Sequence, residues 1–280
     1  MFYVMGSDGR EYGPFTVEQV LQWVAEGRAN GYSRTRRDTE STWRPLREFT
    51  EFASAAPAAG TAPGAPPPLT PEQIANAYLA RNAQVDIGAA VSRGWALVRD
   101  NPGPTIGGFL LVFLITMAIS FVPLLGFIGM LVIGGPISAG LDYVYIRRLR
   151  GEAAGAGDVF DGFSIAFLHL FLVYIVAAVL TSIGFVLCII PGIYLTVGYV
   201  FALPLAIDKR MEFWTAMEVS RRVVHHHWWS VFGYLIVAVL IVFAGLVACL
   251  VGMVVAIPVA IAGLMYLYQD LFGEPGRPTA

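Results

Sequence analysis

Residues 162–207 read GFSIAFLHLFLVYIVAAVLTSIGFVLCIIPGIYLTVGYVFALPLAI, a run of 46 residues without an Asp, Glu, Lys or Arg. A helix needs about 20 apolar residues to cross the hydrocarbon core of a bilayer. The run is therefore long enough for two membrane spans joined by a tight turn, and too short for three. It predicts a helical hairpin inside a membrane.

Two further stretches, Asn101–Ile146 and Trp228–Gln269, have the same character, and the three together contain one charged side chain, Asp142. We therefore expect a membrane all-α fold with six transmembrane helices in three hairpins. Only 14% of the chain is charged, against about 25% in soluble domains, which excludes a wholly soluble enzyme and a disordered chain. The expected spans are residues 104–122, 125–147, 165–188, 191–208, 229–249 and 252–270.

The distribution of Lys and Arg predicts the orientation of these spans. Basic residues precede the first span and fill the connections after the second and fourth, whereas the connections near Pro123, Pro191 and Val251 carry no charge. Because basic loops stay on the cytoplasmic side, both termini are expected there, and no cleaved signal peptide is expected in Met1–Arg10. The basic residues are Arg81, Arg93, Arg99, Arg147, Arg148, Arg150, Lys209, Arg210, Arg221 and Arg222.

Residues 1–52 have the pattern of a small soluble α+β domain. Phe2–Met5 is a short β-type run, and Thr16 is a suitable N-cap for a helix with apolar residues at helical spacing. Residues 53–71 are rich in Ala, Pro and Gly and predict a semi-extended linker. The C-terminal tail is expected at residues 272–280, after a membrane domain over residues 104–271.

Two segments outside the spans predict amphipathic helices. Residues 72–103 carry Ile87, Val91, either Gly94 or Trp95, and Val98 on one stripe, and residues 211–226 carry a charged stripe opposite apolar residues. The charged stripe consists of Glu218, Arg221, Arg222 and His225. We expect both helices at the inner membrane surface; the alternative for the second is a solvated connector.

The chain also contains a weak internal repeat of surface helix, span, turn and span. Val91-Ser92-Arg93 matches Val219-Ser220-Arg221, and Pro136–Gly151 aligns without gaps to Pro258–Gly273. Internal repeats of this length indicate duplicated structural units. The alternative is chance similarity, since apolar sequences match each other easily.

The first 52 residues resemble the bacterial variant of the GYF domain. The similarity rests on Gly13-Pro14-Phe15, on Val20, Trp23 and Gly27 at the signature spacing, and on Trp43-Arg44-Pro45-Leu46. GYF domains are small α+β modules that bind proline-rich peptides on an aromatic surface. The resemblance implies that the peptide-binding residues are Tyr3, Tyr12, Phe15, Trp23, Tyr32 and Trp43.

The chain departs from this family where the signature ends. It has Gly27-Arg28-Ala29 in place of Gly-Tyr-Phe, so two groove aromatics are missing, and Tyr32 would compensate for one. The alternative role for Phe15 and Trp23 is that of core residues in a very small domain.

Residues 85–270 more loosely resemble bacterial six-span YciC-type proteins and the membrane domain fused to some glycerophosphodiester phosphodiesterases. The similarity rests on Pro191–Tyr194, Phe201–Asp208, Ala216–Ser220 and Tyr268–Leu271. It implies a protein of the bacterial cytoplasmic (inner) membrane and no particular reaction. The phosphodiesterase catalytic domain has no counterpart in this sequence.

Asp142 is the strongest candidate for intramembrane chemistry, because an ionisable group inside a span marks a functional site by default. It lies about one turn from the inner end of its span, where snorkelling or pairing with Arg147 or Arg148 would also satisfy it. Pro136, Pro204 and Pro258 fall inside the second span of each hairpin, where they mark either a transport site or simple kinks.

The histidines and cysteines form no recognisable metal pattern. Three consecutive side chains, His225–His227, point about 100° apart on a helix, so we expect interfacial residues and not a metal site. His169 is expected to be a hydrogen-bonded packing residue, and a bridge between Cys188 and Cys249 is a possibility beside simple packing. We expect no enzymatic activity, no cofactor and no metal.

These observations favour a non-enzymatic membrane protein whose cytoplasmic GYF-like domain binds a proline-rich or extended partner peptide. The membrane part would serve as an anchor or scaffold in contact with lipid. The linker's own Pro66–Pro68 is a possible internal ligand, and the net charge of −2 excludes a nucleic-acid partner. The alternative is a transporter or lipid-handling membrane protein with a regulatory GYF-like domain.

Overall fold

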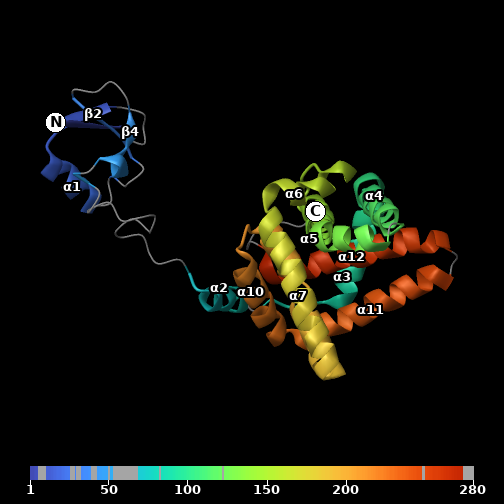
Figure 1. The fold of residues 1–280 in the computed structure, drawn as a ribbon. Coiled ribbons are helices and arrows are strands. Elements are labelled where there is room, and N and C mark those ends of the chain that lie inside the picture. The colour runs from blue at the N-terminus through green and yellow to red at the C-terminus, as the bar shows by residue number, and fades with distance from the viewer. Residues whose placement is uncertain are drawn as a thin grey trace. The chain divides into compact units, whose positions relative to one another are not determined.

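The computed structural model describes residues 1–5, 11–25, 29, 33–38, 43–49, 51–52, 69–81, 83–121, 123–247 and 250–273. The chain divides into two compact units, Met1–Pro68 and Leu69–Ala280. Each unit is described by itself (Figure 1).

The first unit is a four-stranded antiparallel sheet in the order β2-β1-β3-β4 with one α-helix. The helix α1 begins after Thr16, whose hydroxyl accepts a hydrogen bond from the backbone of Gln19 while the Gln19 side chain accepts one from the backbone of Thr16. This reciprocal cap satisfies two amides that the first turn leaves unpaired. The elements are β1 (Phe2–Met5), β2 (Glu11–Phe15), α1 (Val17–Ala25), β3 (Arg34–Arg37), β4 (Arg44–Pro45) and the 3₁₀ turn η1 (Leu46–Glu48).

The core of this unit lies on one face of the sheet. Phe2 and Val4 of β1 point to that face, where Val20 and Val24 of α1 cover them. Phe52 completes the core, and its ring lies edge-on to Phe2 at 5.0 Å between ring centres. Since side chains alternate along a strand, Tyr3 points to the opposite face.

The second unit is entirely helical in its described residues. It begins with α2 (Pro71–Leu79), α3 (Ile87–Asp100), α4 (Pro102–Ser120) and α5 (Pro123–Leu149). It continues with η2 (Ala156–Phe160), α6 (Asp161–Ile165), α7 (Phe167–Leu187), α8 (Ile189–Gly198) and α9 (Ala202–Asp208). It ends with α10 (Phe213–His226), α11 (Trp228–Val247) and α12 (Leu250–Phe272).

Six helices among the described residues are long and apolar enough to cross a membrane, which confirms the expected mostly helical fold with a small sheet before it. Their ends differ from the expected spans by two residues at most; the first, for example, is Pro102–Ser120. They pair as three hairpins, α4 with α5, α7 with α8 and α9, and α11 with α12. The fourth span is interrupted by a turn at Tyr199–Phe201, which separates α8 from α9.

The two helices of each hairpin differ in burial. In the first helices, α4, α7 and α11, 11–17% of the apolar stretch is buried inside the protein. In the second helices the buried share is 44–61%. The second helices therefore form the centre of the unit. In Figure 1 the axis of α7 runs across those of α11 and α12, so the hairpins do not form a parallel bundle.

A short helix precedes each hairpin and packs on the second helix of another hairpin. η2 and α6 pack on α5, α10 packs on α9, and α3 packs on α12. The helices η2, α6 and α10 thus contact the hairpin that precedes them in the chain. In contrast, α3 contacts the last hairpin, α11 with α12. These contacts therefore link the three hairpins and their surface helices into a closed ring.

Glycines allow these helices to approach each other closely. A Cβ atom at Gly162 of α6 would lie 2.0 Å from the carbonyl oxygen of Pro136, and one at Gly140 of α5 would lie 1.8 Å from that of Val159. A Cβ at Gly94 of α3 would lie 2.7 Å from the backbone nitrogen of Gly263. Small residues at helix contacts are typical of membrane proteins, in which packing drives association.

The faces that α3 and α10 bury differ in part from the expected stripes. In α3 the buried residues are Ala90, Gly94, Leu97 and Val98, while Trp95 is exposed. In α10 the apolar face is buried almost completely against neighbouring helices. The apolar side of both helices therefore faces protein to a larger extent than the sequence pattern suggests.

Replacing Gly140 with Ala should destabilise the helical unit by about 2 kcal/mol, because the backbone of Val159 cannot move away as a flexible side chain would. Gly103→Ala is the matched control, since a Cβ there meets no atom within 4 Å and Ala favours helix over Gly by about 1 kcal/mol. Thermal unfolding in detergent should give a lower midpoint for G140A and an equal or higher one for G103A. Equal midpoints for the two variants would contradict the close contact.

Candidate functional site

The face of the sheet opposite α1 carries two of the expected peptide-binding residues. Tyr3 of β1 lies directly opposite Arg36 of β3. The guanidinium carbon of Arg36 lies 4.3 Å from the centre of the Tyr3 ring and 5.4 Å from that of Trp43. Arg36 also pairs with Glu11 of β2. We call this cluster, Tyr3, Arg36 and Trp43, the sheet-face stack.

The other expected residues do not join the sheet-face stack. Phe15 and Trp23 lie with their ring centres 4.5 Å apart and pack against the core as half-buried residues. Tyr12 is exposed on β2, and Tyr32 lies outside the described residues. The structure thus brings Tyr3 and Trp43 together and gives Phe15 and Trp23 a packing role.

The position at which the GYF signature has its Phe is a core position here. Ala29 stands at that position and is buried in the core of the first unit. Gly27 and Arg28 lie outside the described residues. Because Ala is smaller than the Phe of the signature, residue 29 fills less of the core than the signature residue would.

Asp142 does not pair with the arginines that follow it in α5. Arg147 donates a hydrogen bond to Asp158 at 2.9 Å, and Arg148 donates to the carbonyl oxygen of Ala154. Among the described residues, no hydrogen bond or ion pair reaches the half-buried Asp142 side chain. Of the two alternatives to a functional role, snorkelling and pairing with Arg147 or Arg148, the pairing is therefore not formed.

The histidine run lies at the junction of α10 and α11. Nδ1 of His225 lies 3.0 Å from the hydroxyl of Tyr194, and Nδ1 of His226 lies 3.2 Å from the carbonyl oxygen of Arg222. Within the described ranges, no three His, Cys, Asp or Glu side chains gather as metal ligands would. His225 and His226 instead contact a tyrosine hydroxyl and the backbone of their own helix.

Two further candidates have different outcomes. Nδ1 of His169 in α7 is buried and has no hydrogen-bond partner in the described part of the chain, so the expected packing hydrogen bond through this atom is not formed. Cys188 is exposed at the turn between α7 and α8. Cys249 lies outside the described residues, and so does the bridge considered for this pair.

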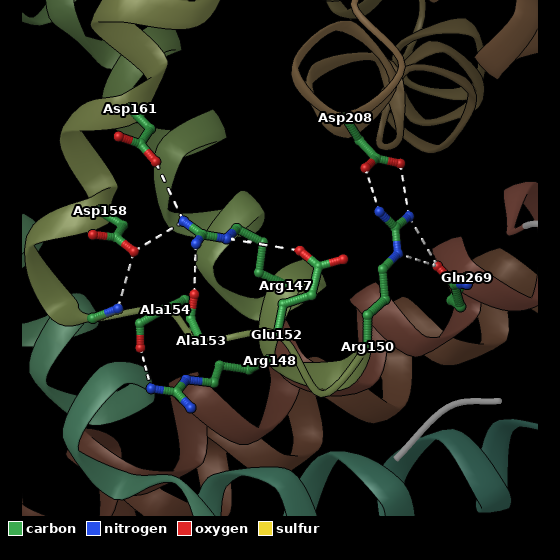
Figure 2. Close-up of polar contacts among 11 residues, drawn as sticks. Arg147, Arg148, Arg150, Glu152, Ala153, Ala154, Asp158, Asp161, Asp208 and Gln269 are labelled. Carbon is green, nitrogen blue, oxygen red and sulfur yellow. Dashed lines mark hydrogen bonds and ion pairs between the residues drawn. The ribbon is translucent and has the colours of Figure 1, made fainter. Parts of the chain in front are cut away.

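The most buried ion pair among the described residues was not recognised as a site from the sequence. Arg150, just after α5, donates two hydrogen bonds to Asp208 of α9 at 2.6 and 2.8 Å. The side chains are 8% and 3% exposed. Arg150 also donates to Oε1 of Gln269 in α12, and the hydroxyl of Tyr268 donates to Asp208 at 2.8 Å. We call these four residues the arginine junction; Figure 2 shows Arg150, Asp208 and Gln269.

The neighbouring Arg147 stabilises the connection between α5 and α6. Besides Asp158, its guanidinium lies 3.5 Å from Asp161 and 3.9 Å from Glu152, as Figure 2 shows. Asp158 also accepts a hydrogen bond from the backbone of Gly155 at 3.0 Å, which caps the 3₁₀ turn η2. Asp158 therefore both caps η2 and pairs with Arg147.

Arg93 connects α3 to α12 in the same way. Its guanidinium donates two hydrogen bonds to Asp270, one of them 3.1 Å long, and lies 4.7 Å from the centre of the Tyr266 ring. The hydrogen bonding with Asp270 raises the pKa of Arg93, against the opposing effect of burial. Arg93, Arg147 and Arg150 thus all bind residues of other elements, in addition to any role in orienting the spans in the membrane.

On α10, a single carboxylate serves two arginines. Glu218 accepts hydrogen bonds from Arg221 at 2.8 Å and from Arg222 at 2.6 Å. Burial raises the pKa of Glu218, but the hydrogen bonds from the two arginines outweigh this effect and lower it below its ordinary value. Arg222 also lies 3.2 Å from Glu72, so this cluster holds α2 against α10.

Comparison with protein-family models, with curated proteins and with solved structures finds no match to this chain. The likeness of the first unit to GYF domains and of the helical unit to YciC-type proteins therefore rests on the motifs alone.

Replacing Asp208 with Asn should cost about 3–5 kcal/mol of unfolding free energy, because the buried Arg150 loses its counter-charge. Asp100→Asn is the control, since it breaks the exposed Arg99–Asp100 pair and should cost about 0–1 kcal/mol. Unfolding in increasing SDS, followed by tryptophan fluorescence, gives both values. The double variant R150M/D208L should be less destabilised than D208N; a larger loss would contradict a penalty due to an unpaired charge.

The contribution of Glu218 to stability should depend on pH. Because folding lowers the pKa of this carboxyl, its contribution is complete above the ordinary value of 4.5 and is lost as the pH falls through the folded value. The wild type should exceed E218Q in stability by up to about 1 kcal/mol at pH 7, and this difference should close below pH 4.5. Thermal midpoints of both proteins from pH 7 to pH 3 test this; a difference that widens on acidification would refute it.

Proposed function

We propose that this protein is a multi-pass membrane protein whose first unit docks a proline-rich, extended segment of a partner protein. The helical unit serves as its membrane anchor. The observation that carries the proposal is the sheet-face stack, in which two aromatic rings lie against one guanidinium on the side of the sheet away from the core.

The chemistry of the sheet-face stack suits a polyproline II ligand. Proline rings in this helix are already ordered, so they pack on flat aromatic side chains at little entropic cost. The guanidinium of Arg36 lies against both the Tyr3 and the Trp43 rings and is itself held by its ion pair with Glu11. Such support lowers the cost of ordering the binding surface when a ligand arrives.

The second element of the proposal, the membrane anchor, is supported by the exposed side chains at the hairpin turns. Phe121, Val186 and Val247 are 75%, 87% and 72% exposed, and each lies at the end of a hairpin helix. Apolar surface of this extent is typical of a protein that contacts lipid. We place the basic connections, and with them both termini, on the cytoplasmic side of a bacterial inner membrane, following the positive-inside rule and the resemblance to bacterial families.

Fluorescein-labelled decaproline should bind the full-length protein in detergent, and Trp43→Ala should weaken this binding at least about tenfold, because an anchoring indole is lost. Trp95→Ala is the matched control, since Trp95 is an exposed tryptophan of the helical unit. Fluorescence anisotropy measures both affinities, with a Gly/Ser peptide of equal length as the negative ligand. The proposal fails if decaproline does not bind with saturation, or if W43A binds it as well as W95A does.

A further inference from the structure

The second hairpin (α7, α8 and α9) runs across the third (α11 and α12), as Figure 1 shows for α7. The helices α7 and α8 stay together, since a Cβ at Gly184 of α7 would lie 3.0 Å from Cα of Gly192 of α8. Two hairpins that run across each other cannot both stand perpendicular to a bilayer. The contacts at their ends indicate how each one lies.

The C-terminal end of α12 gives a reference level for these contacts. Asp208, at the end of α9, and Gln269 of α12 belong to the arginine junction. In the third hairpin, the hydroxyl of Tyr234 donates to the carbonyl oxygen of Ala260 at 2.6 Å. Counting from this contact at 1.5 Å per residue places Trp228, the first residue of α11, within about 5 Å of the level of Gln269. The starts and ends of these helices at the basic connections therefore share one level.

The turn end of α8 lies at the same level. The ring of Tyr194 stacks on that of Trp228 with 6.5 Å between the ring centres, and its hydroxyl lies 3.0 Å from Nδ1 of His225. Tyr194 precedes Asp208 by 14 residues, a path of about 21 Å along a helix. Because both residues lie at the level of the basic connections, α8 and α9 run along that level and do not rise from it.

The charges of α10 indicate that this level is the membrane surface. The hydroxyl of Ser220 donates to the carbonyl oxygen of Gly198 at 2.7 Å, and a Cβ at Gly198 would lie 3.6 Å from Cγ of Arg221. The ion pairs of Glu218 with Arg221 and Arg222 therefore lie beside α8. Charged groups are costly in the centre of a bilayer, so we expect α8 to stay with them at the boundary with water.

The third hairpin has the opposite character. Residues 228–269 contain no Asp, Glu, Lys or Arg, and the ion pair of Arg93 with Asp270 lies at the C-terminal end of α12. The exposed side chains of α11 include Ile236, Val239 and Phe243. With its charges confined to one end, this hairpin suits a path across the bilayer.

Helix length also distinguishes the second hairpin. The helix α8 has 10 residues and α9 has seven, and the turn at Tyr199–Phe201 separates them. Together they are long enough to cross a bilayer, but neither is long enough alone. Apolar helices of such length are typical of re-entrant or interfacial segments.

We propose that the second hairpin, residues 167–208, lies in the cytoplasmic leaflet and does not cross the bilayer, while α11 and α12 span it. The exposed apolar side chains at its turn, Val186, Leu187, Ile189 and Ile190, then contact acyl chains of that leaflet. The hairpin starts and ends on the cytoplasmic side in either case, so the placement of both termini is unchanged. This inference rests on the membrane anchoring proposed above and does not depend on peptide docking.

The thiol of Cys188 reports on the position of the hairpin turn, because it is exposed between α7 and α8. The test uses full-length protein in right-side-out membrane vesicles of a bacterial host, with C249S leaving Cys188 as the single thiol. The matched control is Val247→Cys in a C188S/C249S background, since Val247 is exposed at the end of α11.

A membrane-impermeant maleimide added outside the vesicles should label V247C. It should label Cys188 at least about tenfold more slowly, because the reactive thiolate forms in water and not among acyl chains. In denaturing detergent both thiols should react at similar rates.

A second measurement tests the contact between α8 and α10 in the membrane. In the C188S/C249S background, a short membrane-permeant bis-maleimide should link the pair Y194C/H225C, and peptide mass spectrometry detects the link. The pair Y194C/V247C is the control and should stay unlinked, because Val247 lies at the other end of α11, about 28 Å from Trp228.

Three outcomes would overturn the inference. Labelling of Cys188 from outside as fast as V247C would show that the second hairpin crosses the bilayer, and would leave the membrane anchoring intact. A V247C that stays unlabelled would contradict both the anchoring and the inference. Without the Y194C/H225C link, the arrangement that places α8 beside α10 would not exist in the membrane.

Discussion

A buried guanidinium must have its charge and its donors satisfied, and this requirement organises the helical unit. Arg150 meets it with residues from two other hairpins, Asp208 and Gln269, which lie far away in the sequence. The planar fork of arginine fits a carboxylate in one orientation, so the C-terminal ends of α5, α9 and α12 are held in fixed positions. The opposite ends of the hairpins have no such polar tie among the described residues, and their apolar side chains stay exposed.

Close backbone contacts at glycines also hold the helices together, beside the arginine junction. Gly162 and Gly94 let α6 and α3 touch the backbones of α5 and α12, so the surface helices pack as part of the core. Contacts of this kind rely on shape and not on hydrophobicity, which offers little gain between helices in lipid. The unit therefore combines several arginine-centred polar clusters with tight backbone contacts.

The sequence was sufficient to place the six apolar helices, because bilayer thickness sets their length and charged residues set their ends. It did not reveal the arginine junction, because Arg150, Asp208 and Gln269 have no local spacing that relates them. The buried face of α3 was only partly foreseen, since glycine and alanine face a closely packed helix there and the larger Trp95 faces outward. In the first unit, Tyr3 and Trp43 were named from the resemblance to GYF domains, whereas that resemblance did not point to Arg36, which lies against both rings.

The cyclic packing of the surface helices has a consequence for synthesis of the chain. η2, α6 and α10 pack on helices that the ribosome has already made, so they can dock as they emerge. The partner of α3 is α12, the last of the described helices, so α3 must wait until all the helices between the two have been translated. Because chains fold from the N-terminus during synthesis, α3 and its Arg93 stay without their native partner longest, and docking of α3 closes the ring as the final step.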